Sequence, residues 1–128
     1  MAKIIAFEPW KITTADYIAD RNTQENYEYA KLFTAMGIVI PDNGYLLYAD
    51  NNDDWDRGDH QHAYYDFYNT DFGKPTSGMI EVVEGVAYKQ FERGVIVYNR
   101  TPSEIEVTLP NGMKFKIGPV AGLFLEGY

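Results

Sequence analysis

Two short apolar runs in the first half of the chain, at 3–7 and 45–49, are each followed closely by polar or aromatic side chains. These side chains are Glu8, Trp10, Asp50, Asn51 and Asn52. Carboxylates can exchange protons with a substrate, whereas amides and indole rings can hold one through hydrogen bonds and flat apolar contact. The pattern indicates a binding site. Whether the two groups of side chains form one site depends on how the two runs are placed relative to each other.

The segment between the two runs has the pattern of an α-helix. Asn22 can cap a first turn whose amide donors need partners, and Glu25 follows three residues later. Apolar side chains then recur every three or four residues and predict a helix over 23–38 with one buried stripe. The members of this stripe are Tyr29, Leu32, Phe33, Met36 and Ile40. The stretch from Pro41 to Gly44 ends the helix.

A strand, a helix and a second strand in this order predict a βαβ unit, whose two strands pair in parallel. Ligands of parallel α/β sheets bind beyond the carboxyl ends of the strands. Glu8 and Asp50 stand just after those ends. We therefore expect both carboxylates at one edge of the strand pair.

The second half of the chain has the alternation of antiparallel β-structure. Arg93-Gly94 is a hairpin signature between two apolar runs, and Asn111-Gly112 supplies the positive φ angles of a second tight turn. Strands are expected at 79–84, 87–92, 95–99, 105–109, 113–117 and 123–125. Such short strands predict a small β-sandwich or a meander. The expected fold class is thus α+β, with an α/β segment over 1–72 and an antiparallel β-domain over 73–128.

The composition excludes several classes of function. The chain has 128 residues, with 19 acidic and 11 basic side chains and a net charge of -8, so no nucleic-acid partner is expected. The absence of Cys excludes a thiol nucleophile, a Cys-ligated zinc site and a disulfide. No apolar run approaches the ~20 residues of a membrane span, and the N-terminal residues lack the pattern of a signal peptide. We expect a cytoplasmic protein without a membrane partner. The sequence has no phosphate-binding loop, so no cofactor is expected.

The middle of the chain is strongly acidic, because residues 50–71 carry seven Asp against one Arg, a net charge of -6. Hard cations such as Ca²⁺ bind about six to eight oxygen ligands, which the stretch from Asp50 to Asp59 within this segment could supply. The spacing fails the EF-hand pattern, since Trp55 stands where the turn glycine belongs and Gln61 where the bidentate Glu belongs. A calcium loop of another kind and a solvated acidic loop are the two interpretations left.

His60 and His62 are the two histidines of the chain. Their spacing places them on one face of a strand. A zinc site would need carboxylates such as Asp59 or Asp66 as further ligands. The favoured alternative is hydrogen bonding to a sugar hydroxyl or to a neighbouring loop, so no metal site is expected.

Aromatic side chains stand beside these polar residues. Sugars stack on flat aromatic faces through their C–H groups, but aromatic residues also build ordinary cores. The residues concerned are Trp10, Trp55, Tyr64, Tyr65, Phe67 and Tyr68. The core interpretation is favoured for Tyr65 and Phe67, and both interpretations stay open for Trp10 and Trp55.

A series of motifs between Asn26 and the C-terminus resembles one known group of proteins. The motifs are Tyr29-Ala30-Lys31-Leu32-Phe33-Thr34-Ala35-Met36, Gly44-Tyr45-Leu46-Leu47-Tyr48, Tyr64-Tyr65-Asp66-Phe67-Tyr68, Asp71-Phe72-Gly73-Lys74-Pro75 and Phe91-Glu92-Arg93-Gly94-Val95-Ile96-Val97-Tyr98-Asn99. Their order and spacing resemble the C-terminal part of glycoside hydrolases in which a (β/α)8 barrel precedes a small β-domain. The last motif resembles the hairpin that opens this β-domain.

The resemblance implies a carbohydrate-active protein and gives two residues a role. In many retaining glycosidases with this barrel, the nucleophile follows the penultimate strand, which is where Glu8 stands if 3–7 corresponds to that strand. Asp50 is then the second carboxylate, and the two groups must lie about 5–5.5 Å apart for retention or about 6.5–9.5 Å for inversion. The alternative is that both are ordinary polar residues at strand ends.

The first six of the eight strands of such a barrel have no counterpart in the chain. The resemblance therefore implies a glycoside-hydrolase relative without a complete active site of its own. Three hypotheses stay open: an enzyme that uses Glu8 and Asp50, a non-catalytic carbohydrate-binding or protein-interaction module, and a structural subunit. A homo-oligomer, or a partner chain that supplies the missing barrel, is expected because unpaired strand edges need cover.

Overall fold

The computed structural model describes residues 4–7, 23–41, 45–48 and 65–128. In chain order the elements are β1 (Ile4–Phe7), α2 (Gln24–Val39), β2 (Tyr45–Tyr48), the 3-10 helix η2 (Asp66–Asn69), β3 (Ile80–Val83), β4 (Val86–Phe91), β5 (Gly94–Asn99), β6 (Ile105–Thr108), β7 (Lys114–Ile117) and β8 (Ala121–Glu126). The described part of the chain therefore has an α+β fold with one α-helix, two parallel strands and six antiparallel strands.

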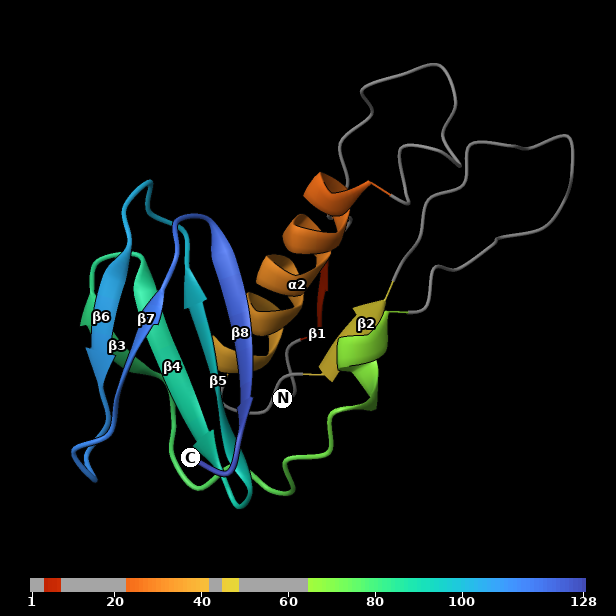
Figure 1. Cartoon of the computed structure of the whole chain (residues 1–128). Coiled ribbons are helices and arrows are strands. Elements are labelled where there is room, and N and C mark those ends of the chain that lie inside the picture. The colour runs from red at the N-terminus through yellow and green to blue at the C-terminus, as the bar shows by residue number, and fades with distance from the viewer. Residues whose placement is uncertain (1–3, 8–22, 42–44, 49–64) are drawn as a thin grey trace, which may run out of the picture.

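The elements form successive layers (Figure 1). Helix α2 lies between the β1–β2 pair and a four-stranded sheet with the order β3-β4-β5-β8. The β6–β7 hairpin lies on the other side of that sheet. This arrangement places the four-stranded sheet in the interior, where it is covered on both faces.

Strands β1 and β2 pair in parallel, which confirms the βαβ prediction. The register places Ile4 opposite Tyr45 and Phe7 opposite Tyr48, so both strands are paired from first to last residue. The two strands are separated in the chain by α2, because a parallel pair needs a long crossover connection.

The six strands after residue 79 are antiparallel, as predicted, but they divide between two sheets. Hairpins connect β4 to β5 and β6 to β7, and Gly112 in the second hairpin has the positive φ of +85° that the turn requires. The last strand returns to β5, where Gly94 pairs with Glu126 and Asn99 pairs with Ala121. The described chain is therefore not one continuous meander, because β6 and β7 pair only with each other.

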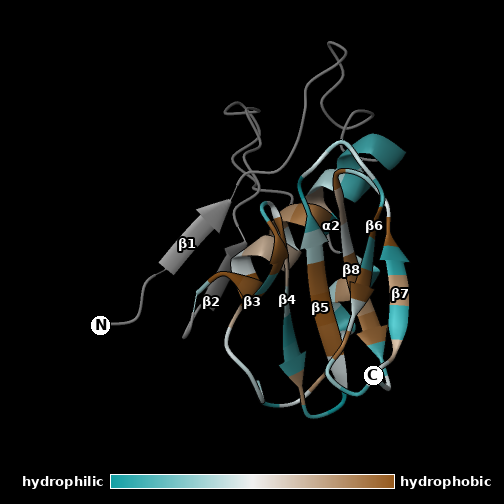
Figure 2. Cartoon of the chain, turned by 90° about the vertical axis from the view of Figure 1, so that its left-hand side faces the viewer, coloured by the Kyte–Doolittle hydropathy of each residue, from teal (hydrophilic) through white to brown (hydrophobic). Residues whose placement is uncertain are grey.

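Strand β5 is buried along its whole length, and Figure 2 shows that much of it is hydrophobic. It contributes side chains to two apolar clusters. Its side chains alternate between the two faces of the sheet, as a strand dictates. On one face lies the helix-side cluster of Leu32, Ala35, Val39, Phe72, Ala87, Ile96 and Tyr98. On the other lies the hairpin-side cluster of Val86, Tyr88, Val95, Val97, Val107, Leu109 and Ile117.

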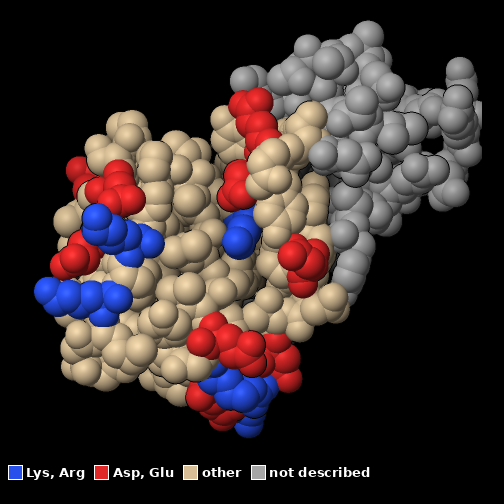
Figure 3. All heavy atoms as spheres, viewed as in Figure 1, with Lys and Arg blue, Asp and Glu red and all other residues tan. Residues whose placement is uncertain are grey.

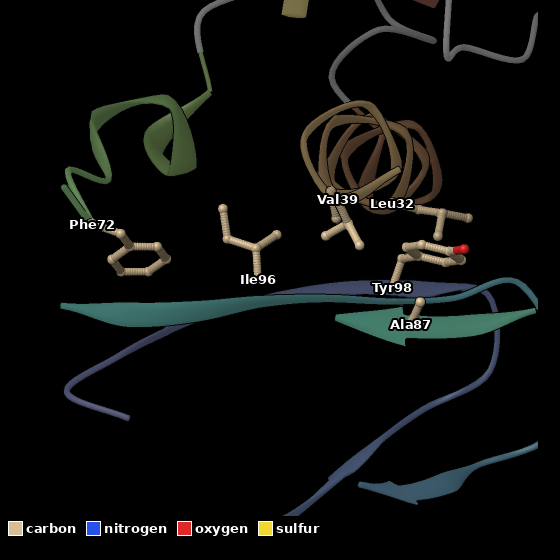
Figure 4. Packing of buried hydrophobic residues seen from close by; sticks show 7 residues of the cluster. Leu32, Val39, Phe72, Ala87, Ile96 and Tyr98 are labelled. Atoms are coloured by element: carbon tan, nitrogen blue, oxygen red, sulfur yellow. The ribbon is translucent and has the colours of Figure 1, made fainter. Parts of the chain in front are cut away.

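The helix-side cluster joins α2 to the four-stranded sheet. Figure 4 shows Leu32 and Val39 pointing from the helix toward Tyr98 and Ala87 of the sheet. Leu32 is 3% exposed and Val39 is fully buried, and each such side chain contributes about 1.5–3 kcal/mol to the burial of apolar surface. Packing against the sheet is therefore the main source of stability for this helix.

Helix α2 is buried on two sides rather than along one stripe. The first side is the one that faces the four-stranded sheet, and the second carries the buried residues Asn26, Ala30, Thr34 and Gly37. Ile40 is 38% exposed, so its predicted place in a buried stripe is wrong. A helix that lies between two sheets needs two buried sides, and a single apolar stripe does not show this.

Within the described residues, no helix is both long enough and apolar enough to cross a membrane.

Candidate functional site

The carboxyl ends of β1 and β2 lie at the same edge of the strand pair. Phe7 and Tyr48, the last residues of the two strands, are paired with each other. Neighbouring strands in a sheet are about 4.8 Å apart, so the two chain segments that continue from these residues start close together. Glu8 follows Phe7 directly, and Asp50 is the second residue after Tyr48.

The residues predicted as catalytic or substrate-binding all lie outside the described part of the chain. They are Glu8, Trp10, Asp50, Asn51, Asn52, Trp55, His60 and His62. The structure therefore supports the strand geometry on which the site hypothesis depends, and the positions of these side chains stay predictions. Tyr64 and Asp59 also lie outside the described residues.

The described residues contain a polar contact between α2 and the segment that follows residue 64. The Tyr27 hydroxyl donates a hydrogen bond of 2.7 Å to Asp66 Oδ1, and the backbone N–H of Phe67 donates a second one of 2.9 Å to the same oxygen. These contacts tie η2 to the first turns of the helix.

This contact changes the acidity of both partners. The hydrogen bond from Tyr27 lowers the pKa of Asp66, because it stabilises the carboxylate, and Lys31 contributes a smaller effect of the same sign. The hydrogen bond to Asp66 raises the pKa of Tyr27 to about 12, helped by burial and by the negative charge of the carboxylate. At neutral pH the pair is a protonated phenol that donates to an ionised carboxylate.

An aromatic cluster surrounds this contact. The rings of Tyr65 and Phe67 stack with centroids 5.3 Å apart, and Phe67 also stacks on Phe124 of β8 at 5.4 Å. Tyr27 approaches Tyr65 and Phe67 edge-on. Phe67 is only 6% exposed, which confirms that it belongs to the core, whereas Tyr65 and Tyr68 are half-buried.

Sequence reasoning did not find the contact between Tyr27 and Asp66. The two residues are 39 positions apart, and neither belongs to a local pattern that points to the other. Asp66 was considered only as a carboxylate for a zinc site with His60 and His62. Its Oδ1 oxygen instead accepts two hydrogen bonds from the protein.

A metal site is not visible in the described part of the chain. No group of three or more His, Cys, Asp or Glu side chains is close enough there to hold an ion. The acidic segment considered for calcium and the two histidines considered for zinc lie outside these residues. Both alternatives therefore stay sequence hypotheses.

The charged side chains on the face shown in Figure 3 gather over β6–β7 and near the β4–β5 turn, where both signs are mixed, and also over α2 and η2, where most are acidic. In the first group Lys116 Nζ lies 3.0 Å from Glu104 Oε1. In the second group Arg93 Nη2 lies 2.7 Å from Asp71 Oδ1. Paired charges of this kind cancel at a distance, so these two groups produce no extended field of one sign.

Comparison with models of protein families, with curated proteins and with solved structures finds no match for this chain.

Proposed function

We propose that this chain is a carbohydrate-active module related to the C-terminal part of barrel-containing glycoside hydrolases. The observation that supports the proposal is the parallel β1–β2 pair, in which Phe7 lies opposite Tyr48. The segments with Glu8 and Asp50 continue from this one edge. Ligands of parallel α/β sheets bind at such an edge.

In this proposal Glu8 and Asp50 are the carboxylate pair. Hydrolysis with retention needs a nucleophile and an acid about 5–5.5 Å apart, and inversion needs about 6.5–9.5 Å to leave room for a water molecule. The spacing of about 4.8 Å between neighbouring strands is compatible with either separation, since side chains can converge or diverge from adjacent positions.

The remaining predicted residues would bind the sugar. Trp10 and Trp55 offer flat apolar faces on which the C–H groups of a pyranose ring can stack. Sugar hydroxyl groups would be bound by hydrogen-bonding side chains, which are Asn51, Asn52, His60 and His62.

The proposal also gives the two antiparallel sheets a place. In the proposal they correspond to the small β-domain that follows the barrel, and the β4–β5 hairpin corresponds to its opening hairpin. The proposal includes the more specific expectation that these strands form a β-sandwich. Its support is the hairpin-side cluster, in which Val95 and Val97 of β5 pack with Val107 of β6 and Ile117 of β7.

The proposal includes association with further barrel strands, supplied by a second copy of the chain or by a partner chain. All four residues of β1 and all four of β2 are apolar or aromatic. Such continuous runs are typical of parallel strands that are covered on both faces in a larger sheet. A measurement of mass in solution tests this part, and a strictly monomeric protein without a partner would count against it.

Binding is tested first with a panel of oligosaccharides and the purified full chain. The proposal expects at least one ligand whose affinity falls about tenfold or more in Trp10→Ala and in Trp55→Ala, because an aromatic platform contributes on the order of 1–2 kcal/mol. Tyr128→Ala is the matched control, since this 37% exposed aromatic residue contacts Phe115 at the end of the β-domain. Equal losses in all three variants would contradict a tryptophan-based sugar site.

Catalysis is tested separately with aryl glycosides. Glu8→Gln and Asp50→Asn keep the shape of each side chain and remove its charge, so they should abolish turnover while the protein stays folded. Unchanged turnover in Glu8→Gln would reject the enzyme. Sugar binding without any hydrolysis by the unchanged protein would instead support the non-catalytic module.

A further inference from the structure

Strand β4 carries a buried lysine on the face of the sheet that α2 covers. Lys89 is 3% exposed and pairs across the ladder with Ile96, a member of the helix-side cluster. Lysine is almost never buried to this degree unless polar groups surround its ammonium group. The partners of this ammonium group therefore show what the residue does.

The Lys89 ammonium group binds the end of α2. Its Nζ atom donates a hydrogen bond of 2.9 Å to the carbonyl oxygen of Ile38 and another of 2.5 Å to that of Pro41. The last carbonyl groups of a helix have no partner within the helix and carry a partial negative charge. The last turn of α2 contains no basic residue of its own. A lysine from the sheet thus performs the capping that the helix sequence does not provide.

We propose that Lys89 is a latch that holds the parallel β1–β2 pair on the C-terminal sheet. Pro41 lies between the end of α2 and the first residue of β2, Tyr45. A hydrogen bond to the Pro41 carbonyl therefore holds the chain four positions before Tyr45. Strand β1 is held in turn, because all four of its residues pair with β2.

The latch lies on the opposite face of the four-stranded sheet from the hairpin-side cluster. The hairpin-side cluster contains no residue of α2, β1 or β2. Loss of the ammonium group would leave two part-buried carbonyl groups at the helix end without this donor. The helix end and the β1–β2 pair should then open more often, while β4, β5 and β8 stay closed.

The test is amide hydrogen exchange of the full chain with Lys89→Met, which keeps an unbranched stem of similar length and removes the donors. Exchange of the β1 and β2 amides should become about 10- to 100-fold faster, the factor that hydrogen bonds to a charged group contribute to an opening equilibrium. Exchange of the β4, β5 and β8 amides should change much less.

Two further variants make the result decisive. Val107→Ala removes fully buried apolar volume from the hairpin-side cluster and should accelerate exchange in β4, β5 and β8 at least as much as in β1 and β2. Lys89→Arg retains a cationic donor on a long stem and should leave the β1–β2 amides close to the unchanged protein.

Three results would overturn the proposal. The first is uniform acceleration in Lys89→Met across all strands, or complete unfolding, because a latch acts on one end of the molecule only. The second is unchanged exchange in β1 and β2. The third is a loss of protection in Lys89→Arg that equals the loss in Lys89→Met. None of these readouts depends on sugar binding, so the latch and the proposed function can fail independently.

Discussion

The side-chain amide nitrogen of Asn99 lies 2.8 Å from the carbonyl oxygen of Gly118, which links the end of β5 to the turn between β7 and β8. The same nitrogen donates to the Ser103 carbonyl at 2.7 Å. Its side-chain oxygen accepts hydrogen bonds from the backbone N–H and the hydroxyl of Thr101, at 2.9 and 2.7 Å. Asn99 is fully buried, so these contacts replace those that water would make.

Replacement of Asn99 should therefore be costly. Asn99→Ala removes the buried side chain that joins these part-buried carbonyl and N–H groups, and we expect the free energy of unfolding to fall by about 2–4 kcal/mol. Urea denaturation followed by fluorescence measures this loss. Thr101→Val removes a hydroxyl that contacts Asn99 Oδ1 and the backbone of Ser103 at a partly exposed position, and should cost less, about 1 kcal/mol. Equal losses in the two variants would mean that Asn99 is not the centre of the network.

The close approach of α2 to β8 predicts a steric effect at Gly122. A Cβ atom on this residue would lie 2.5 Å from the Lys31 carbonyl oxygen and 3.0 Å from the Leu32 Cα, and both belong to the helix backbone. Gly122→Ala should push the helix away from the sheet and cost about 1–3 kcal/mol.

Gly118→Ala is the matched control for this substitution. A Cβ atom at Gly118 would meet nothing within 4 Å, so the change should stay within about 0.5 kcal/mol. Thermal unfolding of both variants compares them directly. A Gly122→Ala protein as stable as Gly118→Ala would show that α2 does not pack closely on β8.

Val120 should be a site where the protein can be stabilised. This β-branched residue has a φ of +47°, in the left-handed region that costs an L-residue roughly 1–2 kcal/mol. Val120→Gly removes that strain, but glycine also has more conformational entropy in the unfolded chain, which offsets part of the gain. The free energy of unfolding should rise by about 0.5–1 kcal/mol.

Val83→Gly provides the comparison for Val120. Val83 is 45% exposed, like Val120 at 40%, but it lies in strand β3 with a negative φ. Glycine there should destabilise by about 1 kcal/mol, because valine favours strands. Destabilisation by both substitutions would show that the Val120 backbone is not strained.

The contact between Tyr27 and Asp66 predicts a pH dependence at both extremes. The pKa of Asp66 is lowered, so its contribution to stability is present above the pKa of the unfolded carboxyl, near pH 4, and is lost as the pH falls through the lower folded value. The pKa of Tyr27 is raised to about 12, so its contribution is present below pH ~10 and is lost as the pH rises toward 12.

Titration of the tyrosine absorbance near 295 nm tests the prediction for Tyr27 at high pH, and NMR of the carboxyl groups tests the prediction for Asp66 at low pH. Asp66→Asn should lower the pKa of Tyr27 from about 12 toward its usual 10, because the negatively charged acceptor is gone. Tyr27→Phe should raise the pKa of Asp66 toward its usual value. An unchanged high-pH tyrosine transition in Asp66→Asn would contradict the contact.

Local sequence patterns determined most of the secondary structure of this protein. The helix predicted over 23–38 is α2, and the strands predicted around Gly94 and Gly112 are β4, β5, β6 and β7. These predictions hold because alternation and the positive φ of Gly112 reflect interactions between residues a few positions apart. The predicted cap was one residue off, since the helix is capped by Thr23 and not by Asn22. The parallel β1–β2 pair was also predictable, since a strand, a helix and a strand leave few ways to pair.

The candidate site was predictable only as far as this strand pair. Its edge is described, whereas Glu8, Asp50 and the other predicted site residues lie outside the described residues. The contacts of Tyr27 with Asp66 and of Lys89 with Pro41 join residues 39 and 48 positions apart. A local pattern cannot specify such partners, because many distant groups have the same chemistry.

The amino-acid sequence by itself determined which segments become helix or strand and which side of each strand is apolar. Only the tertiary structure decided that β8 returns to β5, that α2 is buried on two sides, and that Lys89 lies inside. The physical reason is that burial depends on which surfaces meet. A strand with two apolar faces or a lysine in a strand has several equally good local environments, and the packing of the whole chain selects one.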